Sequence, residues 1–134
     1  MPRWTPPSTA WRRHERPRRA AQLLDIEAIK QLDARDFRLM DLKQWDEWGK
    51  VFTADCVTEV PEADLVNTGR AEIVSNVSGA LVGARTCHHG HMPEIEIAGD
   101  GTARGIWAMF DYVEWAEQDG LRVDSLGAVP DLPS

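Results

Sequence analysis

The sequence predicts an α+β domain in which helices cover one face of an antiparallel sheet. Helical periodicity is confined to residues 25–81, and alternating strands joined by hairpin turns follow in residues 86–115. The 134 residues, 43% hydrophobic and 28% charged, suit one soluble globular domain. No apolar run approaches the roughly 18 residues that cross a bilayer, so a transmembrane protein is not expected.

The charge is divided unevenly between a basic start and an acidic remainder. Residues 1–20 hold six arginines, one acid and four prolines, whereas residues 21–134 hold nine basic and 21 acidic side chains. The first segment is expected to be a disordered tail or an upstream extension, the alternative being a basic arm for an anionic partner. The acidic remainder argues against nucleic-acid binding. Cys56 and Cys87 form no CxxC pair and are expected to be reduced, buried thiols in a cytoplasmic protein.

Three helices are expected in the first part of the chain. Asp25–Met40 carries an apolar stripe at helical spacing, and a short helix follows to about Phe52 with its two tryptophans on one face. Gly69–Leu81 is the third helix, with Thr68 as its N-cap. A short strand, Cys56–Val60, and a polar loop that ends at Thr68 separate the second helix from the third.

From Thr86 onward the apolar period changes to two. Thr86–His91 is one extended run, which a glycine and a proline interrupt, and Glu94–Ile97 alternates after it. A Gly-Asp-Gly turn then leads into the longest strand, Ala103–Trp115. Both faces of that strand are apolar, which predicts a central strand covered on both sides.

Several carboxylates lie where apolar side chains would be expected. On the first helix, Asp36 and more weakly Asp33 fall inside the apolar stripe, and Asp111 is the one charge in the middle of the longest strand's apolar run. A buried carboxylate is costly unless it is paired, protonated or beside a wet cavity. These acids therefore indicate a pocket, the alternative being a slightly rolled helix or pairing with a nearby base. Asp41, at the end of the first helix, is either an N-cap of the second helix or part of that pocket.

The stretch Cys87–His91 (sequence CHHGH) is the densest group of chemically active side chains. On a strand, His89 and His91 share one face and His88 lies on the other. Three interpretations stay open. The first is a metal site, for which only two histidines would converge. The second is a histidine that acts as a general base and exchanges protons near neutral pH. The third is a set of histidines with a structural role. As a base, His88 could meet the misplaced carboxylates if all of them face one cavity.

The order and spacing of several scattered stretches match a known family. They are residues 25–30 (DIEAIK), Phe37-Arg38 through Asp41, Trp45-Asp46-Glu47, His88 through His91 with Pro93-Glu94-Ile95, and Thr102-Ala103, Gly105, Trp107 and Asp111. Over about residues 25–120 the chain resembles the SnoaL-like branch of the nuclear transport factor 2-like superfamily. Within that branch it is similar to bacterial bile-acid 7-alpha-dehydratase and, more distantly, to scytalone dehydratase. The resemblance implies a cone-shaped fold, a cystatin-like roll, in which three helices close a curved antiparallel sheet around a deep pocket.

The resemblance also implies a set of site residues. The dehydratase aspartate at the end of the first helix falls on Asp41, its catalytic histidine on His88 and its third-strand acid on Asp111. The tyrosine that helps polarise the substrate falls on Asp36, which is a departure, and the second histidine of scytalone dehydratase falls near Val113. The residues expected to contact the substrate are Trp107, Met109, His91 and Trp45.

The implied chemistry is a dehydration, isomerisation or cyclisation that begins with proton removal next to a carbonyl. His88 would be the base and would return the proton as an imidazolium, with Asp41 or Asp111 fixing its tautomer. A neutral Asp36 could donate the hydrogen bond of the missing tyrosine. The expected substrate is a small hydrophobic carbonyl compound, polycyclic or steroid-like. No cofactor, metal, nucleic-acid or membrane partner is expected, and the assembly is expected to be a homodimer or homotrimer.

The end of the chain departs from the family pattern. Glycine and prolines break up Leu121–Ser134, so this end is expected to be irregular and the last strands of the sheet to be missing. The expected division is a tail at 1–20, a SnoaL-like domain at 21–120 and an irregular end at 121–134. The alternative function is a non-catalytic ligand-binding or oligomerisation domain, or a truncated gene product.

Overall fold

The computed structural model of the protein describes residues 15–117 and 120–124, and the side chains of residues 18–115. Three helices, one short 3-10 turn and five strands make up this part of the chain. In chain order they are α1 (Glu15–Asp41), α2 (Trp45–Gly49), β1 (Val57–Val60), the 3-10 turn Pro61–Ala63, β2 (Leu65–Thr68), α3 (Arg70–Ala80), β3 (Arg85–Ile97), β4 (Ala103–Glu117) and β5 (Gly120–Asp124). The predicted α+β class is confirmed.

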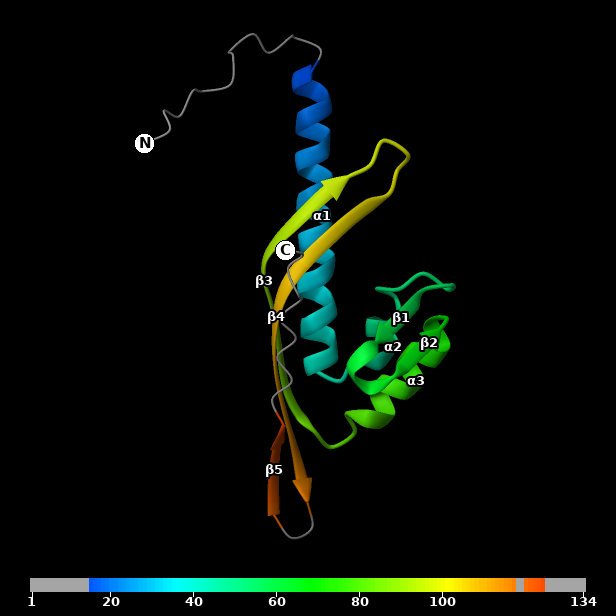
Figure 1. Cartoon of the computed structure of the whole chain (residues 1–134), viewed down its shortest axis with the longest axis vertical. Helices are drawn as coiled ribbons and strands as arrows, with labels where there is room; N and C mark the ends of the chain where they lie inside the picture. Colours follow the sequence, from blue (N-terminus) through cyan, green and yellow to red (C-terminus); the bar gives the residue numbers. More distant parts are fainter. Residues whose placement is uncertain (1–14, 118–119, 125–134) are drawn as a thin grey trace, which may run out of the picture.

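The long helix α1 runs beside the β3–β4 hairpin, while α2, α3 and the β1–β2 pair group together near its C-terminal end (Figure 1). Strands β3, β4 and β5 form an antiparallel sheet in that order, and β1 and β2 form a separate two-stranded sheet. β5 pairs only with the last part of β4, from Val113 to Glu117. The described sheet is therefore a long hairpin that a third strand widens at one end.

Two buried apolar clusters join the helices to the sheet. The first connects α1, α2 and α3, and the second attaches the end of α3 to β4. Their members are Leu39, Trp48 and Ile73 in the first, and Leu81, Ala84 and Val113 in the second. Met40, Trp45 and Val77 pack against both clusters. Because apolar burial is the main driving force for folding, these contacts fix the C-terminal half of α1 against the strands.

A glycine lets α1 approach β3 closely. A Cβ atom on Gly90 would lie 2.6 Å from Cε2 of Phe37 and 3.1 Å from Oδ2 of Asp33, both on α1. Because interiors are close-packed, a larger residue here would push the helix away from the strand. The glycine does not interrupt the strand, contrary to expectation: β3 continues through it, and its register shifts only between His91 and Glu94.

Two expected boundaries in the first half differ from the structure. α1 begins at Glu15, inside the expected tail, and its residues 18–25 are exposed. Neither α1 nor any other described helix is long and apolar enough to cross a membrane. The polar loop expected to end at Thr68 contains β2, which pairs antiparallel with β1. The one buried residue of β2 is the polar Asn67, so no apolar alternation marks this strand in the sequence.

The start of α3 and the end of the sheet also differ from the predictions. The N-cap of α3 is Gly69, with a φ of 89°, and the amide of Thr68 instead donates to the Glu72 carboxylate over 3.1 Å. Part of the segment expected to be irregular forms β5, since Gly120–Asp124 pairs with β4. The rest of that segment, 125–134, and most of the expected tail, 1–14, lie outside the described residues.

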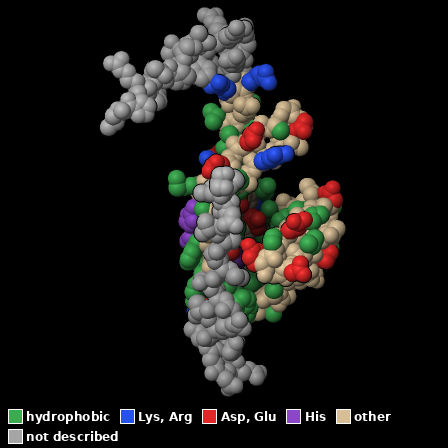
Figure 2. Space-filling model, in the orientation of Figure 1, with side chains coloured by type: hydrophobic (Ala, Val, Ile, Leu, Met, Phe, Trp, Pro, Cys, Tyr) green, Lys and Arg blue, Asp and Glu red, His purple; other side chains and the backbone are tan. Residues whose placement is uncertain are grey.

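The two faces of β4 are not both covered, contrary to the prediction. Val113, on the face toward the helices, is 5% exposed, whereas Ile106 and Phe110 on the opposite face are 61% and 51% exposed within the described part of the chain. Hydrophobic and histidine side chains lie together on this side of the hairpin (Figure 2). Alternation predicts which residues share a face, but it does not predict which element packs against that face.

Candidate active site

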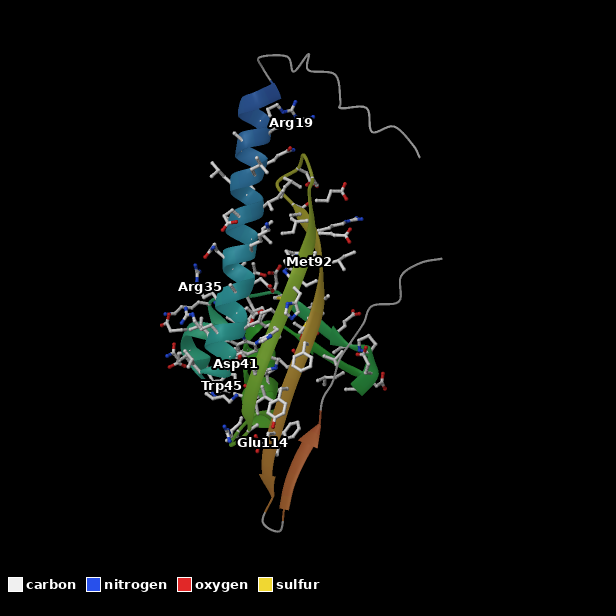
Figure 3. All side chains as sticks on the ribbon, turned by 90° about the vertical axis from the view of Figure 1, so that its left-hand side faces the viewer. Arg19, Arg35, Asp41, Trp45, Met92 and Glu114 are labelled. Carbon is white, nitrogen blue, oxygen red and sulfur yellow. The ribbon has the colours of Figure 1, made fainter. Side chains whose placement is uncertain are left out.

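The candidate site lies where the last turns of α1 face β3 and β4. Asp36 and Asp41 come from α1, His88 comes from β3, and Asp111 is the cross-strand partner of His88 on β4. Figure 3 shows Asp41 at the end of α1, beside β3. Electrostatic interactions link His88 to all three carboxylates. The structure therefore brings the four predicted catalytic residues together.

Asp41 holds His88 at two points. Its Oδ1 accepts a hydrogen bond from Nδ1 of the ring over 2.6 Å, and its Oδ2 accepts one from the backbone N–H over 3.0 Å. Because an ionised carboxylate can only accept, we assign the ring hydrogen to Nδ1 and the lone pair to Nε2. Nε2 has no hydrogen-bond partner among the described residues. The N-cap interpretation of Asp41 is wrong, since the N-cap of α2 is Gln44.

The surroundings of Asp41 favour its ionised form. Burial by itself would raise the pKa of Asp41, but hydrogen bonds from the backbone and ring of His88 and from the hydroxyl of Thr86 outweigh that effect and lower the pKa. Thr86 Oγ1 donates to Asp41 Oδ1 over 2.8 Å, and Lys43 Nζ donates to Thr86 Oγ1 over 2.6 Å. The His88 side chain is 8% exposed, and the ring of Phe37 lies parallel to it at 6.4 Å. These contacts fix the imidazole in one orientation.

Asp111 has a hydrogen-bonding atom that the described residues leave unused. Its Oδ1 is buried and makes no hydrogen bond within the described part of the chain. Desolvation raises the pKa of Asp111, the charge of Asp41 raises it further, and the nearby His88 and His89 offset part of this rise. A carboxyl group in such a setting is protonated more readily than an exposed one. Buried unsatisfied atoms are rare in proteins, so this oxygen is a candidate partner for a bound water or ligand.

Asp36 occupies the position where the resembled dehydratase has a tyrosine. Burial raises the pKa of Asp36, while a hydrogen bond from Trp48 and the nearby His88 offset part of the rise. Trp48 Nε1 donates to Asp36 Oδ1 over 2.5 Å, and Trp48 is 3% exposed. Desolvation and the charge of Asp36 also raise the pKa of Asp33. Asp36 is thus a carboxyl group anchored to the helical core at the edge of the site.

A groove of about 470 Å³ opens between α1 and β3 beside the imidazole. Residues that line it include Phe37, Asp41, Leu42, His88, His89 and His91, whereas Asp36 and Asp111 are not among the lining residues. Its volume lies in the range of small-molecule sites, and it is open to solvent on one side. The structure thus places the predicted substrate contact His91 at this groove.

The other predicted substrate contacts do not line the groove. Trp107 lies over Gly105, where the missing Cβ leaves room for the indole. Met109, on the same face of β4, is 37% exposed. Trp45 packs edge-to-face on Trp48, with 5.6 Å between ring centroids, and belongs to the apolar core. The structure thus places Trp45 against the helical core, and substrate contact by Trp45 stays a prediction.

The histidine-rich stretch divides between the two faces of β3. Cys87 is exposed, contrary to the expectation of buried thiols, and its Sγ lies 3.1 Å from Nε2 of His89. The rings of His89 and His91 are 5.6 Å apart. Among the residues that the structure describes, no three His, Cys, Asp or Glu side chains are placed to hold a metal ion. Only His88 from this stretch is held by a carboxylate.

Sequence reasoning missed two polar residues at the site. Thr86 lies two positions before His88 on the same strand, so strand alternation places both on one face and could have identified it. Lys43 carries no comparable signal, because its contact with Thr86 depends on how the chain turns after α1.

Comparison with known proteins identifies the family. A profile of the SnoaL-like domain matches residues 21–131. A candidate scytalone dehydratase from Novosphingobium aromaticivorans is 18% identical, with a TM-score of 0.65 over 81% of this chain and 76% of that chain. A protein from Catenulispora acidiphila is 22% identical, with a TM-score of 0.62 over 78% and 75%.

A third structure places the fold in its wider class. An NTF2-like protein with a cystatin-like fold from Novosphingobium aromaticivorans is 18% identical, with a TM-score of 0.58 over 85% of this chain and 86% of that chain. At these identities the likeness shows the fold, and the profile match covers most of the chain. The predicted family and fold are confirmed: the chain belongs to the SnoaL-like domain family and has the nuclear transport factor 2-like fold.

Proposed function

We propose that the protein is a dehydratase that removes a proton next to the carbonyl of a small hydrophobic substrate, with His88 as the base. The observation that carries this proposal is the 2.6 Å hydrogen bond between Nδ1 of His88 and Oδ1 of Asp41. It leaves the lone pair of Nε2 to accept a proton, as a general base requires. Because one fold hosts many reactions, the proposal depends on these side chains and not on the family alone.

The reaction begins when Nε2 of His88 takes a proton from the carbon beside the carbonyl. The electron pair of the broken C–H bond moves toward the carbonyl oxygen and gives an enolate. Asp41 stabilises the imidazolium through its hydrogen bond to Nδ1. The hydroxyl group on the next carbon then takes a proton and leaves as water, while the enolate electron pair forms the new C=C bond. The proton comes from the imidazolium, or from Asp111, which regains one from His88 before the next turnover.

Asp111 and Asp36 are the proposed neutral hydrogen-bond donors. Both are partly desolvated carboxyl groups with raised pKa values, and Oδ1 of Asp111 has no partner among the described residues. A protonated carboxyl group can donate a hydrogen bond to the carbonyl oxygen on which negative charge develops. Asp36 would then supply the donor that a tyrosine supplies in the resembled dehydratase.

The proposed substrate is a fused-ring carbonyl compound with a hydroxyl group two carbons from the carbonyl. The groove supports this choice, because Phe37 and Leu42 offer apolar surface while His88 and His91 offer polar groups. The same base would also support an isomerisation, since both reactions begin with the same proton removal.

The ketone 3-hydroxy-1-tetralone tests this proposal, because loss of water converts it to the fluorescent 1-naphthol. We expect the protein to accelerate this conversion and His88→Ala to reduce the rate by about 100-fold or more, the usual contribution of a general base. The control is Met92→Ala, since this side chain of the same strand is 92% exposed and does not line the groove. Circular dichroism checks that both variants stay folded.

The same substrate in deuterated buffer separates the outcomes. Equal turnover by His88→Ala and the unchanged protein would show that His88 is not the base. Deuterium uptake at the carbon beside the carbonyl, without loss of water, would favour an isomerase. Binding of the ketone without deuterium uptake would favour the alternative, a non-catalytic ligand-binding domain.

A further inference from the structure

The turn after α1 places a lysine in a backbone conformation that usually takes glycine. The amides of Lys43 and Gln44 donate to the carbonyls of Met40 and Leu39 over 3.0 and 2.9 Å, which closes the helix end. Lys43 has a φ of 57°, in the left-handed region. A residue with a side chain is strained in this conformation relative to glycine. The contacts of the Lys43 side chain give a reason for a lysine at this position.

The Lys43 side chain starts a chain of hydrogen bonds that ends at the imidazole. Its Nζ donates to Thr86 Oγ1 over 2.6 Å, Thr86 Oγ1 donates to Asp41 Oδ1 over 2.8 Å, and the same Oδ1 accepts from Nδ1 of His88 over 2.6 Å. Lys43 and Thr86 are both half-buried. Water therefore competes less for these bonds than it would at an exposed site.

The direction of each bond follows from what each group can donate. An ammonium group only donates, so the Thr86 hydroxyl must accept from Lys43 and has its own hydrogen left for Asp41. The ionised Asp41 only accepts, so Nδ1 of His88 must carry a hydrogen. Without Lys43 the Thr86 hydroxyl is free to rotate and to accept from other donors. The ammonium group at one end and the carboxylate at the other thus leave a single direction for each bond.

We propose that Lys43 and Thr86 are positioning residues that hold the His88–Asp41 pair with the lone pair on Nε2. The effect of this positioning on catalysis rests on the proposed function, but the hydrogen-bond arrangement does not. Among the described residues, the charged groups that interact with His88 are Asp36 and Asp41 on α1 and Asp111 on β4, while His89 on the opposite face of β3 acts on Asp111. Lys43 faces Asp41 and lies 5.9 Å from the centre of the Trp45 ring.

Removing the lysine has a defined structural consequence. Without the ammonium group, the Thr86 hydroxyl is free to leave Asp41 and accept from other donors, so the carboxylate is held less firmly against Nδ1 of His88. Lys43→Met is therefore expected to shift the His88 ring from one tautomer toward an averaged mixture of the two. Lys43→Gly is expected to give the same change while raising the thermal midpoint, because glycine relieves the strained backbone.

A long-range proton–nitrogen correlation spectrum of the full chain tests the proposal, because it reports which ring nitrogen of His88 carries the hydrogen. The signal is identified by its loss in His88→Gln. Lys43→Arg keeps the charge and Thr86→Ser keeps the hydroxyl, so both should give the pattern of the unchanged protein. The control Lys50→Met removes an exposed lysine that pairs with Glu47, and should also leave the pattern unchanged. An unchanged His88 pattern in Lys43→Met and Lys43→Gly would overturn the proposal. The readout needs no turnover, so it stands even if the ketone is not dehydrated.

Discussion

Two neighbouring cross-strand pairs of the β3–β4 hairpin face opposite sides of the sheet and have different surroundings. His88 and Asp111 face α1, where Asp41 holds the imidazole and one carboxyl oxygen of Asp111 is buried without a partner among the described residues. His89 and Phe110, the next pair in the register, are exposed, and their rings lie 6.2 Å apart. The same two strands thus provide a candidate site or an open surface, depending on whether α1 packs against them.

The largest expected effect on stability comes from forcing α1 away from β3. Gly90→Ala places a Cβ against Phe37 and should lower the free energy of unfolding by about 2 kcal/mol, typical of overpacking. Urea denaturation measures this. Gly99→Ala is the control, because a Cβ on Gly99 meets nothing within 4 Å. Equal stability of both variants would show that α1 does not pack on β3 as closely as described.

Asp41→Asn, on the side of the hairpin that faces α1, should lower the free energy of unfolding by an amount that depends on pH. The pKa of Asp41 is lower in the folded chain than its usual 3.8, so its ionised form adds stability above that value. The substitution should cost about 1 kcal/mol near neutral pH, a figure reduced for solvent screening. The cost should shrink as the pH falls below 3.8 and through the folded pKa. Thermal melts across this pH range measure it, and a constant cost would contradict the role given to the charge.

Asp36→Asn should instead raise the free energy of unfolding near neutral pH. The pKa of Asp36 is raised by burial, so its ionisation destabilises the fold as the pH rises above the usual 3.8. The amide oxygen can still accept the Trp48 hydrogen bond, so we expect the variant to gain about 0.5 kcal/mol near neutral pH. That gain should disappear below pH 3.8 in the same thermal melts. A loss of stability near neutral pH would show that Asp36 needs its charge.

The smallest effect is expected on the exposed face. Ile106→Thr should change the free energy of unfolding by less than about 0.5 kcal/mol, as for most surface substitutions. Val113→Thr, on the buried face of the same strand, should cost more because its hydroxyl enters an apolar cluster. Urea denaturation compares the two. A large cost for Ile106→Thr would mean that this face is covered in solution, which would support the prediction of a homodimer or homotrimer.

Much of this site could be predicted because it depends on alternation and helical spacing. Asp36 and Asp111 interrupt apolar patterns, and His88 lies on the strand face that Asp111 shares, so their proximity follows from the sequence pattern. Asp41 was a candidate from its position at the end of the first helix, and the resemblance assigned it to the pocket. The role of Trp45 is harder to predict, because an apolar residue at helical spacing can pack in a core or line a pocket, and the pattern is the same for both.

The features that escaped prediction depend on contacts between distant segments. β2 has no apolar alternation, and its pairing with β1 is stabilised by backbone hydrogen bonds that any sequence can make. Lys43 reaches Thr86 only because the helix end adopts a left-handed turn. The exposed face of β4 is apolar in the sequence, yet exposure depends on which other element lies nearby.

The central claim is that Asp41 holds His88 with a hydrogen on Nδ1 and a lone pair on Nε2. A long-range proton–nitrogen correlation spectrum of the full chain, recorded just above neutral pH, reports which ring nitrogen carries the hydrogen. We expect a protonated Nδ1 and an unprotonated Nε2 for His88, and an averaged pattern for the exposed His89. A hydrogen on Nε2 of His88, or an averaged pattern like that of His89, would contradict the claim.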